Sequence, residues 1–323
     1  RSRRLEVGIE GRDVTTTEEC GWALRAGDDR QSTFVAGTGR PEPSLALPEP
    51  TAPGLELPEP RHSSPTSAGG ALENESLVGE SQGFALLDEV ARRLEREVPG
   101  AWLIRARLED GASRARIENS LGLECESRYR LAILRLRAGE RPTGAREVDL
   151  VATAGSWRGF SAAALARRLA DLLLVEHGEP PGGGSRVAGP MVLSPAVGAR
   201  VVAGLVPALL GREAWRHLRA LQDEDGRLGS GAFTLVDDGR LADGMLAAPV
   251  DGEGVATREV VLVEGGVVRQ PLLPWNEAEG GGRTSGCRSR YSWREPPRLG
   301  PTHLYLRPDP AISPAALLRD LDR

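Results

Sequence analysis

The chain has 323 residues, of which 40% are hydrophobic, and a formal net charge of −5. This length suffices for two or three domains. Acidic and basic residues are interspersed along the chain, which argues against the charged surface typical of proteins that bind nucleic acid or membranes, so we expect neither as a partner. All 41 basic residues are arginine, which excludes sites that need a lysine, such as a Schiff base or a Walker A motif.

The cysteines and the apolar runs predict a soluble, cytoplasmic protein. Cys20, Cys125 and Cys287 are odd in number, far apart and without CxxC spacing, so they indicate neither a disulfide framework nor a zinc knuckle. No run reaches the roughly 18 to 20 apolar residues of a membrane span, and no signal peptide is recognisable. Residue 1 is arginine, so whether the N-terminus is complete is an open question.

The first 65 residues are predicted to be short strands followed by a linker. Residues 19–25 and 32–36 resemble strands separated by glycine turns, and we expect them at a sheet edge. Residues 40–65 are dense in proline, glutamate and serine, which favours an extended surface linker over a recognition motif.

Residues 66–178 form the second predicted region, an α/β layer. Apolar residues recur on one face of a predicted helix at 84–98, and Pro99-Gly100 ends it. Period-two alternation predicts strands at 102–108, 129–137 and 147–154. A second helix is predicted at 161–176, with a serine cap at its start and Gly178 after its end.

The glycine-rich residues 178–190 mark the main predicted boundary, and residues 185–323 form a C-terminal domain. Here Ser194 as N-cap and Pro195 at the first position predict a helix at 195–211. Its residues are apolar nearly all round, which predicts that it is buried. Pro207 should bend it, and residues 212–221 should continue as a polar helix. Strands are predicted at 232–236, 260–263, 267–273 and 302–306. The expected fold class is α+β: antiparallel strands with packed helices, then a strand-rich, barrel-like domain.

Familiar catalytic motifs are missing from the sequence. None of the four histidines begins an HExxH or HExxxH motif, and G-x-S-x-G is also absent. Cys287 has arginines at 288 and 290 that could lower a thiol pKa, but no histidine is near it in the sequence. Catalysis by Cys287 is therefore not the favoured interpretation.

Two acidic loops contain glycine and precede a hairpin with a Glu-Gly-Gly turn. They carry Asp237, Asp238, Asp251 and Glu253, whose carboxylates could hold a hard cation. The spacing matches no EF-hand, and Asp-Gly pairs are ordinary turn residues. We favour structural loops.

The same region carries a resemblance to a known family. DDGRLADG, VDGEGVATREVVLVEGGVV, TSGCRSR and PPRLGPTHLYLRPDPAISPAALL follow one another in the order and spacing of the C-terminal region of the TldD/TldE (PmbA) metallopeptidases. The likeness extends back through GPMVLSPAVGARVV and more weakly through WLIRARLEDG. It covers most of the chain beyond about residue 80.

The resemblance implies a TldE-like subunit. In the TldD type, HExxxH lies on the helix after the VL-x-P strand, and the matching positions here are Ala203, Gly204 and Ala208. None can bind zinc or move a proton. The resemblance therefore implies a non-catalytic chain without a cofactor, whose TldD-type partner holds the zinc and which helps to process an extended peptide. Asp251, Glu253 and Cys287 would then line the chamber. Two alternatives stay open: a self-sufficient hydrolase that uses these three residues, or a non-enzymatic peptide-binding or assembly protein.

Overall fold

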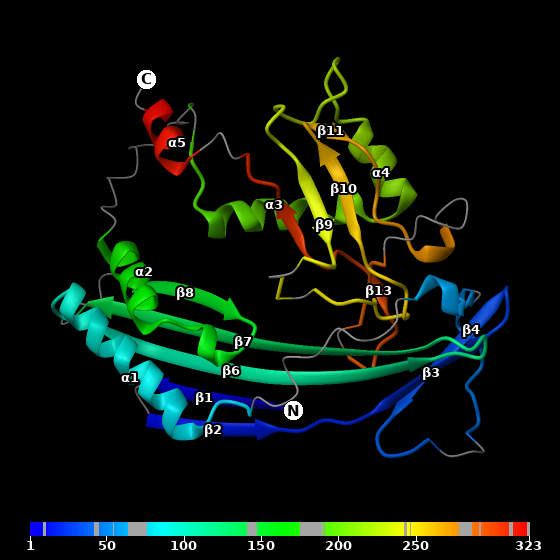
Figure 1. The fold of residues 1–323 in the computed structure, drawn as a ribbon, viewed down its shortest axis with the longest axis horizontal. Coiled ribbons are helices and arrows are strands. Elements are labelled where there is room, and N and C mark those ends of the chain that lie inside the picture. The colour runs from blue at the N-terminus through cyan, green and yellow to red at the C-terminus, as the bar shows by residue number, and fades with distance from the viewer. Residues whose placement is uncertain are drawn as a thin grey trace. The chain divides into compact units, whose positions relative to one another are not determined.

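The computed structural model describes residues 1–8, 11–41, 45–53, 55–63, 76–140, 147–174, 189, 191–241, 244–245, 247–277, 286–290, 292–309 and 313–321. The fold combines helices with several antiparallel sheets, which confirms the predicted α+β class (Figure 1). The chain divides into two compact units, and each consists of three segments. The first contains Arg1–Glu19, Gly69–Arg114 and Arg128–Val187; the second contains Cys20–Ala68, Ala115–Ser127 and Ala188–Arg323.

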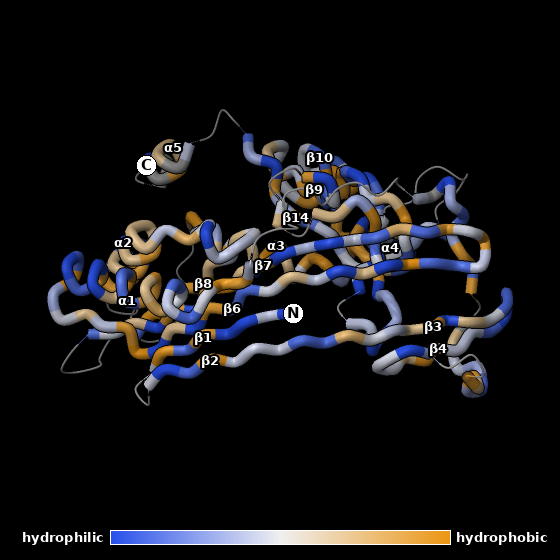
Figure 2. The backbone as a smooth tube through the Cα atoms, turned by 60° about the horizontal axis from the view of Figure 1, so that its bottom comes forward, coloured by the Kyte–Doolittle hydropathy of each residue, from blue (hydrophilic) through white to orange (hydrophobic). Residues whose placement is uncertain are grey.

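The first unit is organised around a five-stranded sheet with the order β2-β1-β6-β7-β8. Its strands are β1 (Ser2–Gly8), β2 (Gly11–Thr17), β6 (Ala101–Glu118), β7 (Glu124–Glu140) and β8 (Glu147–Ala154). The predicted strands at 102–108, 129–137 and 147–154 are confirmed. Burial alternates along much of β6 and β7, and Figure 2 shows hydrophobic and hydrophilic stretches following one another along these strands. This is the period-two pattern of strands with one buried face.

Two helices cover one face of this sheet. They are α1 (Glu80–Glu97) and α2 (Ala162–Leu174), which lie beside each other in Figure 1. α1 begins four residues before the predicted start, and its Leu87, Val90 and Leu94 are buried against the sheet core with Leu108. The Ser161 hydroxyl accepts a hydrogen bond from the backbone N–H of Ala164 at 3.3 Å, which confirms the predicted serine cap.

A buried ion pair joins two strands on the covered face of the sheet. The carboxylate of Asp110 lies 2.8 Å from the Arg130 guanidinium, and both side chains are at most 1% exposed. Asp110 also accepts a hydrogen bond from the backbone N–H of Val78 at 2.8 Å, and Arg130 donates one to the Ser76 carbonyl at 2.9 Å. The pair therefore fixes the chain segment that leads into α1.

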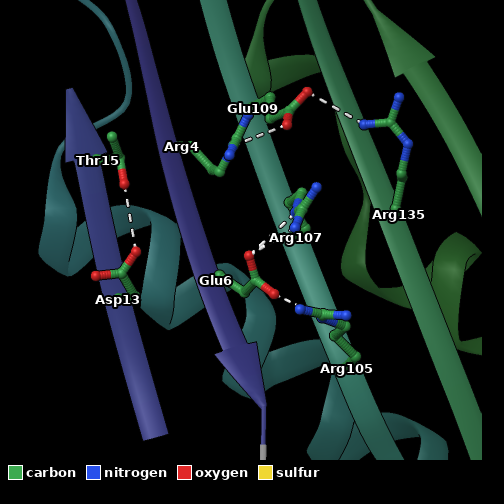
Figure 3. Close-up of polar contacts among 8 residues, drawn as sticks. All are labelled: Arg4, Glu6, Asp13, Thr15, Arg105, Arg107, Glu109 and Arg135. Carbon is green, nitrogen blue, oxygen red and sulfur yellow. Dashed lines mark hydrogen bonds and ion pairs between the residues drawn. The ribbon is translucent and has the colours of Figure 1, made fainter. Parts of the chain in front are cut away.

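The opposite face of this sheet carries exposed charges (Figure 3). Arginines and carboxylates from neighbouring strands pair across it: Glu109 with Arg4 and Arg135, and Glu6 with Arg105 and Arg107. Cross-strand pairs of opposite charge stabilise a sheet modestly and keep this face hydrated.

The second unit contains three small sheets. One has the order β3-β4-β5, from β3 (Trp22–Gly27), β4 (Gln31–Gly37) and β5 (Ala52–Pro53). Another has the order β11-β10-β9-β14, from β9 (Leu235–Asp238), β10 (Glu259–Glu264), β11 (Val267–Val268) and β14 (Leu304–Leu306). The third pairs β12 (Arg288–Ser289) with β13 (Arg298–Leu299). None of the sheets that the structure describes closes into a barrel, so the barrel-like expectation is not met.

The proline-rich segment, residues 40–65, is held by hydrogen bonds to other parts of the second unit at several of its described residues. The backbone N–H of Thr51 donates to the Ser32 carbonyl, and that of Leu55 donates to the Asp28 carbonyl. The side-chain amide of Asn119 donates to the Pro58 carbonyl at 2.7 Å. The segment is nevertheless extended and largely exposed, as predicted, apart from the short 3-10 helix Pro60–His62.

The apolar helix is present, but the prediction that it is buried is wrong. α3 (Pro195–Leu209) begins at the Ser194 cap, contains Pro207 and is followed by α4 (Gly211–Arg219), as predicted. Of its large residues only Val202 and Leu209 are buried, whereas Val197 is 46% and Val201 is 54% exposed. The apolar pattern in the sequence gives the composition of the helix surface, but it does not determine whether other residues of this chain bury that surface.

The predicted boundary at 178–190 lies outside the described residues, except for residue 189. The predicted regions 1–65, 66–178 and 185–323 therefore stay a prediction. The C-terminal part also contains α5 (Pro314–Leu321). Within the described residues, no helix is long and apolar enough to cross a membrane.

Candidate functional site: a charged pocket beside the acidic loop

The acidic loop consists of Asp251, Gly252, Glu253 and Gly254, and Asp251 organises it. Asp251 Oδ1 accepts hydrogen bonds from the backbone N–H groups of Glu253 at 2.9 Å and Val255 at 3.0 Å. Asp251 Oδ2 accepts one from the backbone N–H of Arg288 at 3.0 Å. An aspartate that bonds backbone groups in this way forms an Asx-type turn. The preference for a structural loop at Asp251 thus has a specific cause.

The two glycines allow close packing of the loop. A Cβ on Gly252 would lie 2.7 Å from the Arg288 carbonyl oxygen, which accepts a hydrogen bond from the Gly252 N–H. Gly254 has φ +86° and packs on the end of the β6–β7 hairpin, where a Cβ would meet Leu123 and Cys125. A side chain at either position would displace the loop from its supports.

Glu253 points its carboxylate between two guanidinium groups. Its Oε1 lies 3.6 Å from Arg25 Nη1 and its Oε2 lies 3.2 Å from Arg288 Nε, although the Glu253 side chain is only 13% exposed. The Arg288 Nε is buried and has no hydrogen-bond partner, so its contact with Glu253 is an ion pair without hydrogen-bond alignment. The carboxylate is therefore held by charge more than by directed bonds.

Burial raises the pKa of both acids in the loop. The pKa of Asp251 rises to about 6 because burial outweighs its hydrogen bonds from the backbone. Burial also raises the pKa of Glu253 to about 6, against the lowering effect of the Arg288 and Arg25 charges, and the nearby Asp251 adds to the rise. Burial lowers the pKa of the neighbouring Arg290 guanidinium. Two buried acids with a raised pKa thus lie in one short loop.

A pocket of about 370 Å³ opens beside Glu253. Four structural elements contribute to this charged pocket in addition to the acidic loop: β3, the segment after β5, β12 and the 3-10 helix η4 (Trp275–Glu277). The lining residues are Arg25, Glu56, Glu253, Trp275, Asn276, Glu277 and Arg288. Arg212 of α4 donates a hydrogen bond to the Glu277 carbonyl and so fixes η4. The pocket combines both signs of charge with one large aromatic ring.

Cys287 does not join this pocket. Its thiol is 1% exposed, lies in the apolar core with Leu262 and Leu272, and is 3.3 Å from the Leu273 carbonyl oxygen. Cys287 directly precedes β12, so two consecutive residues of the chain contribute a cysteine to the core and an arginine to the pocket. The chamber-lining role predicted for Asp251, Glu253 and Cys287 stays a prediction.

The other acidic loop is a structural joint. Asp237 is fully buried, and its Oδ1 accepts hydrogen bonds from the backbone N–H groups of Thr302 at 2.8 Å and His303 at 2.7 Å. These bonds attach β14 to β9, while Asp237 Oδ2 has no hydrogen-bond partner. Burial raises the pKa of Asp237. Across the described residues, no three His, Cys, Asp or Glu side chains come together as a possible metal site.

The positions compared with the zinc motif lie on α3. Ala203 and Gly204 are exposed, and Ala208 is half-buried against the core of the second unit. Methyl groups and a hydrogen atom offer no ligand to zinc. The residues present therefore do not fit this metal.

Sequence analysis missed most of the charged pocket. Arg288 was noted only as a neighbour of Cys287, and Arg25, Trp275 and Glu277 were not singled out. Arg25 and Glu253 come from distant parts of the chain, and no local pattern links them. Of the pocket residues, only Glu253 stands out in the sequence, because it is an acidic residue between two glycines.

One comparison with known proteins matches the C-terminal part of the chain. Residues 186–323 match the family model of the PmbA/TldA metallopeptidase C-terminal domain. An uncharacterized protein of Methanocaldococcus jannaschii is 32% identical over 107 residues. That match covers 32% of this chain and 25% of the relative, so the chain spans about a quarter of that curated protein.

Two solved structures share the fold. A proposed modulator of DNA gyrase from Thermotoga maritima has a TM-score of 0.69 at 17% identity, and the match covers 100% of this chain and 75% of that one. TldE from Thermococcus kodakarensis has a TM-score of 0.69 at 16% identity, with 95% and 73% covered. At these identities the likeness establishes the fold alone.

Proposed function

This chain belongs to the TldD/PmbA metallopeptidase family through its residues 186–323, and from this premise we propose that it is a TldE-like, non-catalytic subunit. Its partner is a TldD-type chain that carries the zinc and the catalytic residues, and the pair acts on small or unfolded peptides in the cytoplasm. Neither nucleic acid nor membrane takes part. The family's chemistry needs a hydrolytic metal, and this chain contributes structure to the enzyme instead of ligands.

The observation that carries the proposal is the composition of α3. By the family resemblance, Ala203, Gly204 and Ala208 are the counterparts of the zinc-motif residues, and none of them has a side chain that can bind a metal. The same helix exposes Val197 and Val201, and the segment before it exposes Met191 at 76%. Apolar side chains gathered in this way are typical of a surface that a partner covers.

The geometry weighs against the self-sufficient hydrolase. The Cys287 thiol is buried in the core, and both oxygens of Asp251 accept backbone hydrogen bonds. Glu253 has a pKa of about 6, which suits a general base, but its carboxylate is held between Arg25 and Arg288. The non-enzymatic binding protein remains the second candidate, favoured by the charged pocket.

Co-expression with a TldD-type chain that carries HExxxH tests the proposal. We expect the two chains to co-purify, the complex to cleave an unfolded peptide, and zinc to be present in the complex. The isolated chain should show neither stoichiometric zinc nor peptidase activity. Turnover of the peptide by the isolated chain, abolished by Cys287→Ala, would establish the self-sufficient hydrolase instead.

A pair of matched variants tests the role of α3. Val201→Glu puts a charge on a residue that is 54% exposed on α3, and Val151→Glu does the same at 56% exposure on β8 of the first unit. Both should leave the isolated chain folded. We expect only Val201→Glu to weaken co-purification, and equal binding of both variants would contradict the assignment of α3 to the interface.

A further inference from the structure

The charged pocket contains arginine side chains whose hydrogen-bond donors exceed the acceptors that the pocket offers them. Arg25 and Arg288 share the single carboxylate of Glu253, and each arginine side chain is about one quarter exposed. Each guanidinium has five N–H donors, and one carboxylate cannot satisfy both groups. The two arginines can therefore donate hydrogen bonds to a second carboxylate, supplied by a ligand.

Two other lining residues of the pocket carry the opposite charge. They are Glu56 and Glu277, which are exposed, and neither is in an ion pair among the described residues. Their carboxylates are free to pair with an ammonium group. Trp275 lies among these charges with its ring half-buried, where it can cover an apolar side chain or the ammonium itself.

The walls of the pocket are fixed before any ligand binds. The Gly252 N–H donates to the Arg288 carbonyl, and the Arg288 N–H donates to Asp251 Oδ2 at 3.0 Å, so Glu253 and Arg288 are held on adjoining backbones. Arg212 fixes η4 through the Glu277 carbonyl. A preformed site loses little entropy on binding.

From this arrangement we propose that the charged pocket binds a small zwitterion, a free amino acid or a short peptide, with its carboxylate on Arg25 and Arg288 and its ammonium at Glu56 and Glu277. The volume of about 370 Å³ lies at the small end of ligand pockets and suits a ligand of one or two residues. An arginine pair is well suited to a carboxylate because the guanidinium fork matches its geometry. This proposal deepens the proposed function. It rests on that function for one point only, namely that peptides handled by the proposed enzyme are the source of the ligand.

Calorimetric titration of the isolated chain tests the site without any partner subunit. The ligands are glycyl-phenylalanine, its N-acetyl derivative, its C-terminal amide and free phenylalanine. We expect the unmodified dipeptide to bind and both modified forms to bind at least about tenfold more weakly, because each lacks one charge-assisted contact. Comparison with free phenylalanine distinguishes an amino-acid site from a peptide-end site.

Three variants place the binding in the pocket. Arg25→Gln should weaken dipeptide binding by about tenfold or more, because it removes a charged donor. Glu277→Gln alters an exposed side chain on η4, so it keeps the test valid if Arg25→Gln does not fold. Arg269→Gln, outside the pocket on an exposed arginine paired with Glu264, is the matched control and should bind as the unchanged chain does.

The proposal is overturned if no ligand binds at millimolar concentration, if the amide or acetylated dipeptide binds as well as the free one, or if the pocket variants bind unchanged. These results would not touch the proposed subunit role, which depends on co-purification with the TldD-type chain. Conversely, a chain that fails to pair but binds the dipeptide would retain the site and lose the proposed partner.

Discussion

Glu253→Gln is expected to change the pH dependence of stability with a defined sign. The pKa of Glu253 rises from its ordinary value of 4.5 to about 6 in the folded chain, chiefly because of burial. A group with a raised pKa in the folded state contributes stability that is fully present below its unfolded pKa. That contribution is lost as the pH rises through about 6, because the buried carboxylate must then carry a charge.

The magnitude follows from the size of the shift. One pKa unit corresponds to about 1.4 kcal/mol, so a rise from 4.5 to about 6 corresponds to about 2 kcal/mol. Below pH 4 the protonated Glu253 and a glutamine are nearly isosteric and equally neutral. Relative to the unchanged chain, Glu253→Gln should therefore gain about 2 kcal/mol of unfolding free energy between pH 4 and pH 7.

Urea unfolding of the two proteins across this pH range measures the difference. Glu277→Gln, the same chemical change at an exposed position, reports the effect of the substitution outside the buried ion pair. The reasoning is refuted if, relative to the unchanged chain, Glu253→Gln loses unfolding free energy as the pH rises from 4 to 7. That sign would mean that Arg25 and Arg288 outweigh burial and hold the carboxylate in its charged form.

Three further predictions concern stability and are measured by urea unfolding. Asp110→Ala should cost about 3 to 5 kcal/mol, because it leaves the Arg130 charge buried and unpaired, and replacing both residues with leucine and methionine should recover most of that loss. Asp251→Ala should cost about 1 to 3 kcal/mol, because it leaves the backbone N–H groups of Glu253, Val255 and Arg288 without their acceptor; an unchanged midpoint would contradict the hydrogen-bond arrangement. Leu209→Ala should cost about 2 to 5 kcal/mol at a residue that is 1% exposed, and the half-buried Leu205→Ala should cost less; equal losses would mean that the two sides of α3 are equally buried.

Local periodicity predicted the elements that a single pattern determines. The helix now seen as α1 and the strands within β6, β7 and β8 follow from the spacing of their apolar residues, which is the same property that buries them. β1 and β2 were missed, because only Leu5, Val7 and Val14 mark their inner faces among polar residues. The place of β1 in the sheet depends on pairing with β6, about a hundred residues away, and such pairing leaves no local signal. β2 joins the sheet only through β1.

The charged pocket shows the same limit at the level of the site. Two glycines around an acid indicate a tight turn, and that much was predicted for Asp251 and Glu253. The pairing of Glu253 with Arg25 depends on the contact between the acidic loop and β3, which only the folded second unit provides. The chain has 41 arginines, and no local sequence pattern distinguishes Arg25 and Arg288, which contact the Glu253 carboxylate, from the others.

The error over α3 is the most informative one for function. A helix that is apolar all round must be covered, because exposed apolar surface costs free energy in proportion to its area. The sequence argument assumed that the cover comes from the same chain, but only one side of α3 packs on the core, through residues such as Val202, Ala208 and Leu209. On the other side, Val197 and Val201 are exposed. The described residues of this chain leave part of that apolar surface uncovered. The proposed partner subunit would cover this surface. Under that proposal, the small residues Ala203 and Gly204 belong to an interface that needs no metal ligand.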